Sequence, residues 1–346
     1  MRQAVQSAWL RRGPLACLLW PLSLLFGVLV ALRKRLYRSG RLKSEKLPVP
    51  VIVVGNVVAG GAGKTPVLLA LLEHLAARGL KAGVIARGYG RTSRDCLEVT
   101  ATSQPEEVGD EPLLIQRAAA VPVVVATRRI DAGRALLAAH PQVQVIVCDD
   151  GLQHLALQRD IELCVFDARG VGNGWLQPAG PLREPWPREV DFVLTDKTFV
   201  PHTRCFTLER HLAPLVCNSA GERVELATLR ARPVLAVAGI ANPPAFFAML
   251  REQDLVLECT FALPDHYDFS APLPLDPAMR VVCTEKDAAK LWRSRPDAWA
   301  VPLVVRIDPA FWPALDRLLD AKLSSVHGSE TAWAAGLPGH QRPPRL

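Results

Sequence analysis

The sequence predicts an α/β fold in which a parallel sheet domain carries helices on both faces, with a smaller C-terminal α/β domain after it and an N-terminal apolar membrane-associated helix before it. Three observations lead to this prediction. From residue 46 onward, continuous apolar runs rich in valine and isoleucine alternate with helical patterns, as in parallel sheets that are covered on both sides. A glycine-rich loop follows the first of these runs, and an uncharged apolar stretch precedes it.

The apolar stretch extends from Pro14 to Leu32 and contains no charged residue. A helix of this length measures about 28 Å, close to the thickness of a bilayer's hydrocarbon core. Lysines and arginines are denser after the stretch, over residues 33–46, than before it, so the positive-inside rule places the rest of the chain in the cytoplasm. The following RKRLYRSG is not a signal-peptide cleavage site. Pro21 and Gly27 keep a buried core helix as an alternative, and the sequence leaves open whether the helix spans the bilayer or dips into one leaflet. We assign residues 1–45 to this helix and its basic flank.

Residues 46–204 are predicted to form the larger domain. A first strand in VPVIVVGN leads into the glycine-rich loop, and TPVLLALLEHLAARGL forms the next helix, with Pro66 in its first turn and Gly79 beyond its end. The segment RIDAGRALLAAHP is expected to be a connecting helix. Further strands are expected in KAGVIARGYG, VPVVVAT, VQVIVCDD, IELCVFDA and DFVLTDK.

The remainder of the chain divides into three parts. Residues 205–230 contain short strand patterns around a turn at Gly221 and are expected to bridge the domains. Residues 231–324 predict a smaller α/β domain, with a strand, turn and helix in RPVLAVAGIANPPAFFAMLREQDL, strands in MRVVCTEKDAAKLW and WAVPLVVRID, and a final helix in PAFWPALDRLLDAKL. Residues 325–346, rich in Gly, Pro and polar residues, are expected to be disordered.

The loop NVVAGGAGKTP has the features of a phosphate-binding P-loop, which makes the larger domain P-loop NTPase-like. A strand precedes it and a helix follows, so backbone N–H groups at the helix N-terminus can bind phosphates. Lys64 would contact the β- and γ-phosphates and Thr65 would hold Mg²⁺, which makes ATP and Mg²⁺ the expected cofactors. Val58 departs from the pattern, because a glycine is required at its position. Nucleotide contacts are expected from the whole loop: Val58, Ala59, Gly60, Gly61, Ala62, Gly63, Lys64, Thr65 and Pro66.

Two carboxylate pairs are candidates for the chemistry. Asp149 and Asp150 end a buried strand, where P-loop proteins place a carboxylate that binds Mg²⁺. The alternative is an ordinary strand-end turn, which the upstream P-loop disfavours. Asp110 and Glu111 precede a helix, and the residues alone do not decide between a helix cap at Asp110 and a base that takes a proton from an attacking hydroxyl.

A histidine in the smaller domain is a further candidate. His266 lies in the loop FALPDHYDF, where a lone histidine is usually only solvated. It gains a role if the two domains close over a cleft, because it can then pair with a carboxylate. Other polar residues lie at strand ends or in loops, where ligands of open α/β sheets bind, but each could equally form an exposed ion pair: Arg87, Tyr89, Arg91, Arg128, Arg129, Arg183, Glu184, Glu285, Lys286 and Asp287.

Composition narrows the possible partners. The chain of 346 residues has a formal net charge of +7, and much of the excess lies near the N-terminus. No basic stripe interleaved with aromatic residues is present, so nucleic-acid binding is not expected. The 8 cysteines form no C-x-x-C pair and several lie in apolar runs, which favours free thiols in a reducing compartment over zinc sites or disulfides. No feature indicates a protein partner.

Seven motifs in this order resemble those of the tetraacyldisaccharide 4'-kinase family, the lipid A 4'-kinases: VVGNVVAGGAGKTPV, IARGYGR, GDEP, DDGLQH, NGWLQPAGPLREP, LPDHYDF and TEKDAAKL. The resemblance extends from about Ala4 to the final helix. The family typically has Thr or Ser at the position of Val58. The resemblance implies a kinase that transfers the γ-phosphoryl group of ATP to the 4'-hydroxyl of a tetraacylated glucosamine disaccharide 1-phosphate, a late step of lipid A biosynthesis. It also implies a location at the cytoplasmic face of the bacterial inner membrane, with that membrane surface and the lipid disaccharide as partners.

The same resemblance implies residue roles, motif by motif. Lys64 and Thr65 correspond to residues that bind phosphates and Mg²⁺, and Asp149 and Asp150 correspond to the metal-binding pair. Asp110 corresponds to the proposed base, and His266 corresponds to its partner. Five further residues correspond to polar positions expected to bind substrate: Glu111, Arg129, Gln153, His154 and Arg183.

Two other functions are compatible with parts of the sequence. A membrane-bound P-loop ATPase that acts as a switch requires only the N-terminal helix and the loop, but it leaves GDEP and LPDHYDF without a role. A membrane-tethered binding protein with a degenerate loop would not transfer a phosphoryl group at all. Dependence of ATP consumption on added lipid disaccharide distinguishes the kinase from the switch.

Overall fold

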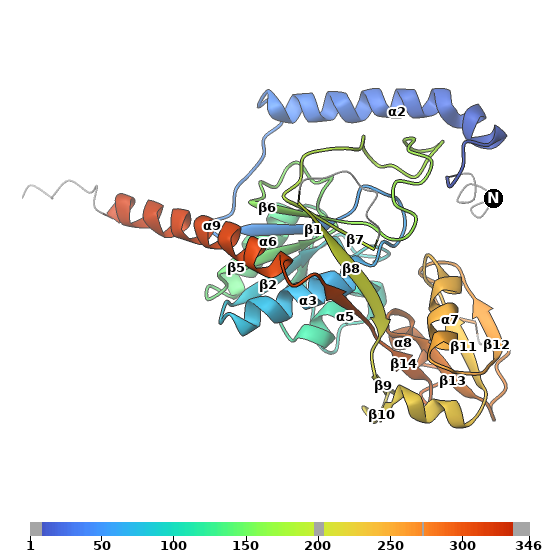
Figure 1. Ribbon diagram of the computed structural model, residues 1–346. Helices are drawn as coiled ribbons and strands as arrows, with labels where there is room; N and C mark the ends of the chain where they lie inside the picture. The colour runs from blue at the N-terminus through green and yellow to red at the C-terminus, as the bar shows by residue number, and fades with distance from the viewer. Residues whose placement is uncertain (1–8, 197–203, 272, 335–346) are drawn as a thin grey trace, which may run out of the picture.

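Two sheets of unequal size form the body of the protein (Figure 1). The computed structural model describes residues 9–196, 204–271 and 273–334. Over these residues, the larger sheet has the strand order β15-β8-β7-β6-β1-β5-β2-β4-β3, and the smaller sheet has the order β10-β9-β14-β13-β11-β12. The predicted α/β fold with a parallel sheet and a smaller second α/β unit is confirmed.

The larger sheet is parallel except at its two edges. Its parallel strands are β1 (Val51–Gly55), β2 (Ala82–Ala86), β4 (Val123–Val125), β5 (Val145–Asp149), β6 (Ile161–Val165), β7 (Phe192–Thr195) and β8 (Cys205–Leu212). The antiparallel edge strands are β3 (Leu97–Glu98) and β15 (Leu303–Ile307). The strands β1, β2 and β5 are buried along their whole length, which explains why they carry continuous apolar runs.

Helices cover both faces of this sheet. Side chains of α3 (Lys64–Ala77), α5 (Asp110–Ala119) and α9 (Phe311–Ala334) join one apolar core, and those of α6 (Arg129–Ala139) join the core on the other face. The short α4 (Pro105–Val108) leads into α5. Helix α9 continues ten residues into the stretch expected to be disordered, and residues 335–346 of that stretch lie outside the described residues.

The smaller unit contains one strand and two short helices that the sequence patterns did not reveal. Its elements are β9 (Leu215–Cys217), β10 (Arg223–Glu225), the 3-10 helix Leu226–Ala231, β11 (Val234–Ala238), α7 (Pro243–Glu252), β12 (Leu257–Ala262), β13 (Arg280–Thr284), α8 (Glu285–Leu291) and β14 (Trp299–Val301). Strand β12 is an edge strand with mostly exposed residues, so it lacks an apolar run. In TEKDAAKL the strand ends at Thr284, whose side chain accepts a hydrogen bond from Asp287 N and begins α8.

The chain crosses between the sheets twice, and the two crossings are hydrogen-bonded to each other. Pro302 separates β14, in the smaller sheet, from β15, in the larger one. Beside it, Ala213 N donates to Pro302 O at 2.9 Å just after β8. The expected boundaries placed residues 205–212 in a bridge and residues 303–324 in the smaller domain. Strand pairing and core packing instead join both segments to the larger sheet, and we propose that the larger domain includes them.

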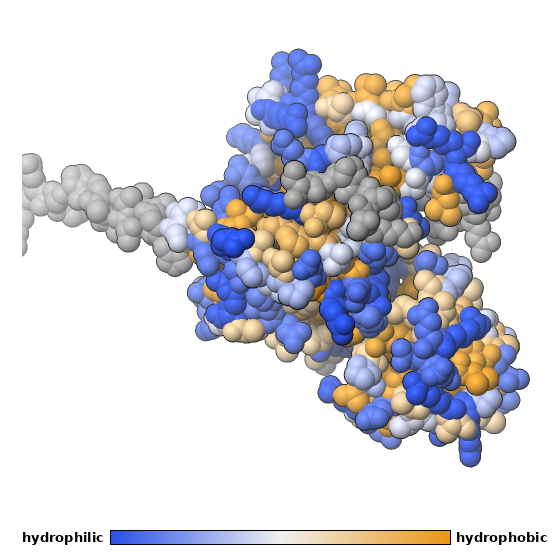
Figure 2. Space-filling view, in the orientation of Figure 1, coloured by the Kyte–Doolittle hydropathy of each residue, from blue (hydrophilic) through white to orange (hydrophobic). Residues whose placement is uncertain are grey.

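The N-terminal helix α2 (Pro14–Arg38) lies across the loop that connects β6 to β7 (Figure 1). Ser23 Oγ donates to Leu176 O at 2.8 Å and accepts from Ala179 N at 2.9 Å. The opposite face is exposed and apolar, with Leu18, Leu22, Leu25, Val28, Leu29 and Leu32. Figure 2 shows hydrophobic surface, in orange, along the edge of the molecule formed by α2.

This exposure bears on the alternative of a buried core helix. Among the described residues, α2 is the one helix that is long and apolar enough to cross a membrane, and 11% of its most apolar window is buried. A core helix would be buried on most of its surface. The alternative therefore does not fit, and the exposed apolar face requires another environment.

The packing of α9 generates a stability prediction. Phe311 is 1% exposed and contacts the rings of Phe192 and Phe206 with centroid distances of 5.4 and 5.6 Å. We expect Phe311→Ala to lower the free energy of unfolding by about 3–5 kcal/mol, because it leaves a cavity in the larger core. Urea unfolding of the detergent-solubilised protein measures this change. The exposed Val304 in β15 is the control, and Val304→Ala should cost less than about 1 kcal/mol. Equal effects would contradict the grouping of α9 with the larger sheet.

Candidate active site

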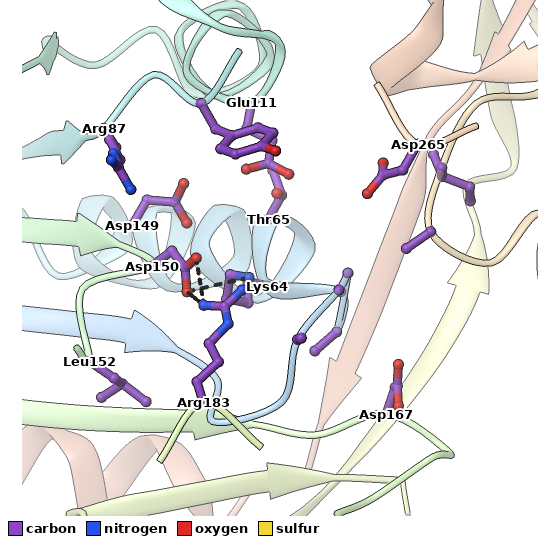
Figure 3. Close-up of a pocket in the computed structure, with 18 of the residues that line it drawn as sticks. Lys64, Thr65, Arg87, Glu111, Asp149, Asp150, Leu152, Asp167, Arg183 and Asp265 are labelled. Atoms are coloured by element: carbon purple, nitrogen blue, oxygen red, sulfur yellow. Dashed lines mark hydrogen bonds and ion pairs between the residues drawn. The ribbon is translucent and has the colours of Figure 1, made fainter. Parts of the chain in front are cut away.

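A cavity of about 1340 Å³ lies where the P-loop, the ends of β2 and β5, the smaller unit and α2 meet. It opens at the carboxyl ends of the parallel strands, where open α/β sheets bind ligands. Figure 3 shows Lys64, Asp149, Asp150 and Arg183 on one side of it and Asp265 of the smaller unit across from them.

The P-loop lines this cavity with every residue from Ala59 to Pro66. Gly60 and Gly63 have positive φ angles of 94° and 68°, and Gly63 is the N-cap of α3. This is the backbone that a phosphate-binding loop requires, because it allows N–H groups at the helix N-terminus to point at a phosphate. Gly61 has no positive φ, but a Cβ there would lie 3.2 Å from the Cβ of Ala241 in the smaller unit. Val58 is 3% exposed in the core, so its side chain does not reach the cavity.

Two arginines bind backbone carbonyls of the P-loop, and the sequence reasoning missed both. Arg169 Nη2 donates to Gly61 O at 2.9 Å and is itself paired with Asp167 at 2.7 Å. Arg210, which also lines the cavity, donates from Nη2 to Ala62 O at 2.8 Å. Both lie more than a hundred residues from the loop, in segments without a recognisable motif, so only the fold brings them to it. By binding these carbonyls they help to fix the conformation of the loop.

Lys64, Asp150 and Arg183 form a charged cluster at the centre of the site (Figure 3). Lys64 Nζ lies 3.6 Å from Asp150 Oδ1, and Arg183 Nη1 donates to both Asp150 oxygens at 3.0 and 2.9 Å. Burial raises the pKa of Asp150, but Lys64 and Arg183 outweigh it and lower that pKa below its usual value. Asp150 is therefore an ionised carboxylate held in place, and its φ of 46° shows that the turn is constrained.

Asp149 differs sharply from its neighbour. Its side chain is buried and its Oδ1 has no hydrogen-bond partner. Burial, followed by the charge of Glu111, raises the pKa of Asp149 to about 7. Arg129, which is 3% exposed, donates to the backbone oxygen of Asp149 at 3.1 Å. A buried carboxylate oxygen without a partner is the group that a cation would satisfy.

These residues fit a magnesium ion. In nucleotide sites Mg²⁺ is usually bound by one or two carboxylates together with substrate phosphates. Asp149 and Asp150 provide the carboxylates, and Thr65 lies at the start of α3, beside the phosphate cradle (Figure 3). The unpartnered Asp149 oxygen supports this fit most directly.

Asp110 and His266 meet across the two units. His266 Nδ1 lies 3.0 Å from Asp110 Oδ2, and Lys290 Nζ lies 2.7 Å from Asp110 Oδ1 and 2.8 Å from Oδ2. Burial raises the pKa of Asp110, but the hydrogen bonds from His266 and Lys290 outweigh it and lower that pKa. The N-cap of α5 is Gly109, and Asp110 is the first helical residue, so the helix-cap alternative for Asp110 is wrong.

His266, rather than Asp110, lines the cavity. An ionised Asp110 can only accept, so Nδ1 carries the proton, and Nε2 of the neutral imidazole is a hydrogen-bond acceptor. Lys286 Nζ lies 3.2 Å from that Nε2, and the Tyr89 ring packs at 4.9 Å from the imidazole. His266 has a φ of 61°, uncommon for a residue with a side chain, and this places it at the domain junction.

Three comparisons with known proteins bear on this site. A family model described as tetraacyldisaccharide-1-P 4'-kinase matches residues 15–323. The chain belongs to this family. Relatives named tetraacyldisaccharide 4'-kinase include a protein from Acidovorax sp., 58% identical over 332 residues that cover 94% of this chain and 97% of the relative, and one from Delftia acidovorans, 54% identical over 325 residues that cover 92% and 95%.

A solved structure of the same family supports the fold. The crystal structure of the apo form of LpxK from Aquifex aeolicus in complex with ATP has a TM-score of 0.77 to this chain at 30% identity. The match covers 88% of this chain and 99% of the other. The predicted family, the predicted fold class and the predicted enzyme class are thus confirmed, since the relatives are named as kinases and the solved structure is a complex with ATP.

As a member of this kinase family, the chain brings all of its expected substrate-binding residues to one cavity. Glu111, Arg129, Gln153, His154 and Arg183 each line it. Burial and then Arg129, Arg87 and Arg33 lower the pKa of His154 to about 4, so this histidine is neutral at physiological pH. The helix α2 adds Arg33 and Lys34 to the lining, which the sequence analysis did not anticipate.

The state of Asp149 generates a pH prediction. Its pKa is raised in the folded protein, so its ionised form destabilises the fold, and this cost grows as pH rises from about 4, where the unfolded chain ionises, to about 7. We expect Asp149→Asn to remove this pH-dependent cost. Its melting temperature relative to wild type should rise from pH 4.5 to pH 7 and stay level above that, without nucleotide or Mg²⁺. A difference that is constant with pH would contradict the burial of an ionisable, unpaired Asp149.

Proposed function

We propose that the chain transfers the γ-phosphoryl group of ATP to the 4'-hydroxyl of a tetraacylated glucosamine disaccharide 1-phosphate, in lipid A biosynthesis. One observation carries the proposal: a single cavity joins a phosphate-binding loop, an Asp–His pair and the apolar helix α2. Relatives more than half identical to this chain are named for this reaction. The phosphate-binding loop suits a nucleotide, the Asp–His pair suits an acceptor hydroxyl, and the apolar helix suits acyl chains.

The nucleotide side positions the phosphates. The P-loop N–H groups and Lys64 bind the β- and γ-phosphates, and Lys64 supplies a cation where negative charge gathers in the transition state. Arg183 holds Asp150 beside Lys64. When bound, Mg²⁺ held by Thr65, Asp149 and Asp150 would neutralise phosphate charge and orient the transferred group. Phosphoryl transfer requires mainly this positioning and charge neutralisation.

The acceptor side removes a proton from the sugar hydroxyl. Because both Asp110 oxygens are occupied and His266 lines the cavity, we propose that the two act as a pair. Asp110 fixes the tautomer of His266 and stabilises its charged form. The substrate hydroxyl replaces Lys286 beside Nε2, and Nε2 accepts the hydroxyl proton as the new P–O bond forms and the bond from the γ-phosphorus to the ADP oxygen breaks. The sequence reasoning gave Asp110 the role of base and His266 the assisting role; the geometry favours the reverse division within the same pair.

The membrane side holds the acyl chains. We propose that the exposed leucines of α2 enter one leaflet of the inner membrane at its cytoplasmic face, with the helix axis along the surface, because the opposite face of α2 is hydrogen-bonded to the loop after β6. The acyl chains of the substrate can then stay in the bilayer while the sugar enters the cavity beside α2. An ATPase switch would not need an Asp–His pair in the cavity, so this rival is disfavoured.

The proposed function predicts the effect of removing Asp110. Asp110→Ala should lower kcat by about 10²–10⁴-fold, because the proton acceptor loses its orienting partner, and should leave ATP binding within about threefold. The assay uses ATP, Mg²⁺ and the disaccharide 1-phosphate in detergent micelles, with product identified as phosphorylated at the 4'-position. No 4'-phosphorylated product from the wild-type enzyme would overturn the function, and unchanged kcat for Asp110→Ala would overturn the role of the pair.

The proposed membrane contact predicts a loss of binding. Replacing the exposed Leu18 and Leu25 by serine should release the protein from phospholipid vesicles, because both side chains lie on the outer face of α2. Vesicle flotation measures the bound fraction. Leu215→Ser provides a control, since Leu215 is a similarly exposed leucine in the smaller unit. An unchanged bound fraction for the double variant would contradict the contact.

A further inference from the structure

We propose that Lys34, on the membrane helix α2, is a positioning residue for the kinase site, so that this helix is part of the catalytic apparatus as well as an anchor. The inference rests on the proposed function. It starts from one contact: Lys34 Nζ lies 2.6 Å from Glu184 Oε2, in the loop beneath α2.

A continuous chain of side chains leads from this contact to the nucleotide site. Glu184 Oε1 accepts from Gln153 Nε2 at 2.8 Å, and Gln153 Oε1 accepts from Arg183 Nη1 at 3.3 Å. The same Arg183 nitrogen binds both oxygens of Asp150. Four successive contacts thus join Lys34 to the carboxylate that faces Lys64 of the P-loop.

The contact between Lys34 and Glu184 matters because the Glu184 side chain is buried. The Glu184 side chain is 2% exposed, whereas Lys34 is 29% exposed at the surface of the cavity. Burial would raise the pKa of Glu184, but Arg188, Lys34 and Gln153 outweigh it and keep that pKa below its usual value. Arg188 also pairs with Glu162, which has Arg159 as a second partner at 2.6 Å, and Arg188 lies 3.3 Å from Oε1 of Glu184. Lys34 is the cation at Oε2, so removing it would leave that buried oxygen without its charged partner, and the carboxylate would attract the nearest cations and amides.

The neighbours that Glu184 would attract are Gln153 and Arg183, and these side chains also hold Asp150 in place. Gln153 is tied to Glu184 through its amide nitrogen and also donates to Asn56 O, beside the P-loop, at 3.1 Å. If Glu184 draws Gln153 and Arg183 toward itself, the Arg183–Asp150 contact lengthens. Asp150 would then be less precisely placed for Mg²⁺·ATP. Outer residues that orient metal-binding carboxylates commonly change affinity or activity in this way.

The helix supplies a matched control. Arg38 lies one turn beyond Lys34 on α2, is exposed, and forms no ion pair among the described residues. Lys34→Met and Arg38→Met remove the same charge from the same helix. Only the first breaks the contact with Glu184, so their difference isolates positioning from general attraction to a charged surface.

The test compares these variants and Lys34→Arg in detergent micelles, where no charged bilayer is present. Lys34→Met should lower kcat by about 10- to 100-fold with the KM for the lipid substrate little changed, Lys34→Arg should restore most of it, and Arg38→Met should stay within about twofold of wild type. Independently of turnover, Lys34→Met should raise the Mg²⁺ concentration needed for ATP to stabilise the protein against thermal unfolding.

The possible outcomes distinguish failure of this inference from failure of the proposed function. If wild type produces no 4'-phosphorylated lipid, the proposed function fails, while the Mg²⁺ dependence of ATP stabilisation still tests Lys34. If Lys34→Met folds poorly, the double variant Lys34→Met/Glu184→Gln removes the buried charge, should restore folding, and should still need more Mg²⁺ than wild type because Gln153 loses its anionic partner. Lys34→Met equal to Arg38→Met in kcat and in Mg²⁺ dependence would overturn the inference.

Discussion

The contact between Asp110 and His266 is the interaction on which the proposed chemistry of the site depends. It joins a residue at the start of α5, in the larger unit, to a loop of the smaller unit. With Lys290 it forms a buried, fully paired group, and such groups are costly to break. Together with the ion pairs Lys286–Glu111 and Arg293–Glu106 it links the two units. It also orients His266, which lines the cavity, so the proposed proton transfer depends on it.

Much of this architecture is predictable from the sequence because its physical causes are local. The apolar runs of β1 and β5 follow from their complete burial, and the Gly63–Thr65 end of the P-loop follows from the backbone that phosphates require. Features that arise only from the tertiary structure were not predicted. Arg169 and Arg210 act only through the fold, and β12 is an exposed edge strand. The side chain of Val58 packs in the core, so a nucleotide contact from this residue stays a prediction for its backbone alone.

The membrane association and the catalysis that we propose share one structural solution in this protein. Helix α2 presents leucines outward and uses Ser23 and Lys34 to dock on the loop that carries Arg183 and Glu184. That loop also contacts the P-loop, where Ala59 N donates to Pro181 O at 2.8 Å. On the proposed function, a lipid substrate beside α2 would therefore be connected through this loop to the nucleotide site. The buried Asp149 is destabilising without a cation, which is a common cost of a prearranged site.

A double-mutant cycle on Asp110 and His266 tests the central claim most directly. The kcat of Asp110→Ala, of His266→Ala and of the double variant would be compared with wild type under saturating ATP, Mg²⁺ and lipid. If the two residues act as one proton-accepting pair, each single variant loses nearly as much activity as the double variant, because either change disables the same unit. Losses that multiply in the double variant would show independent roles and contradict the account.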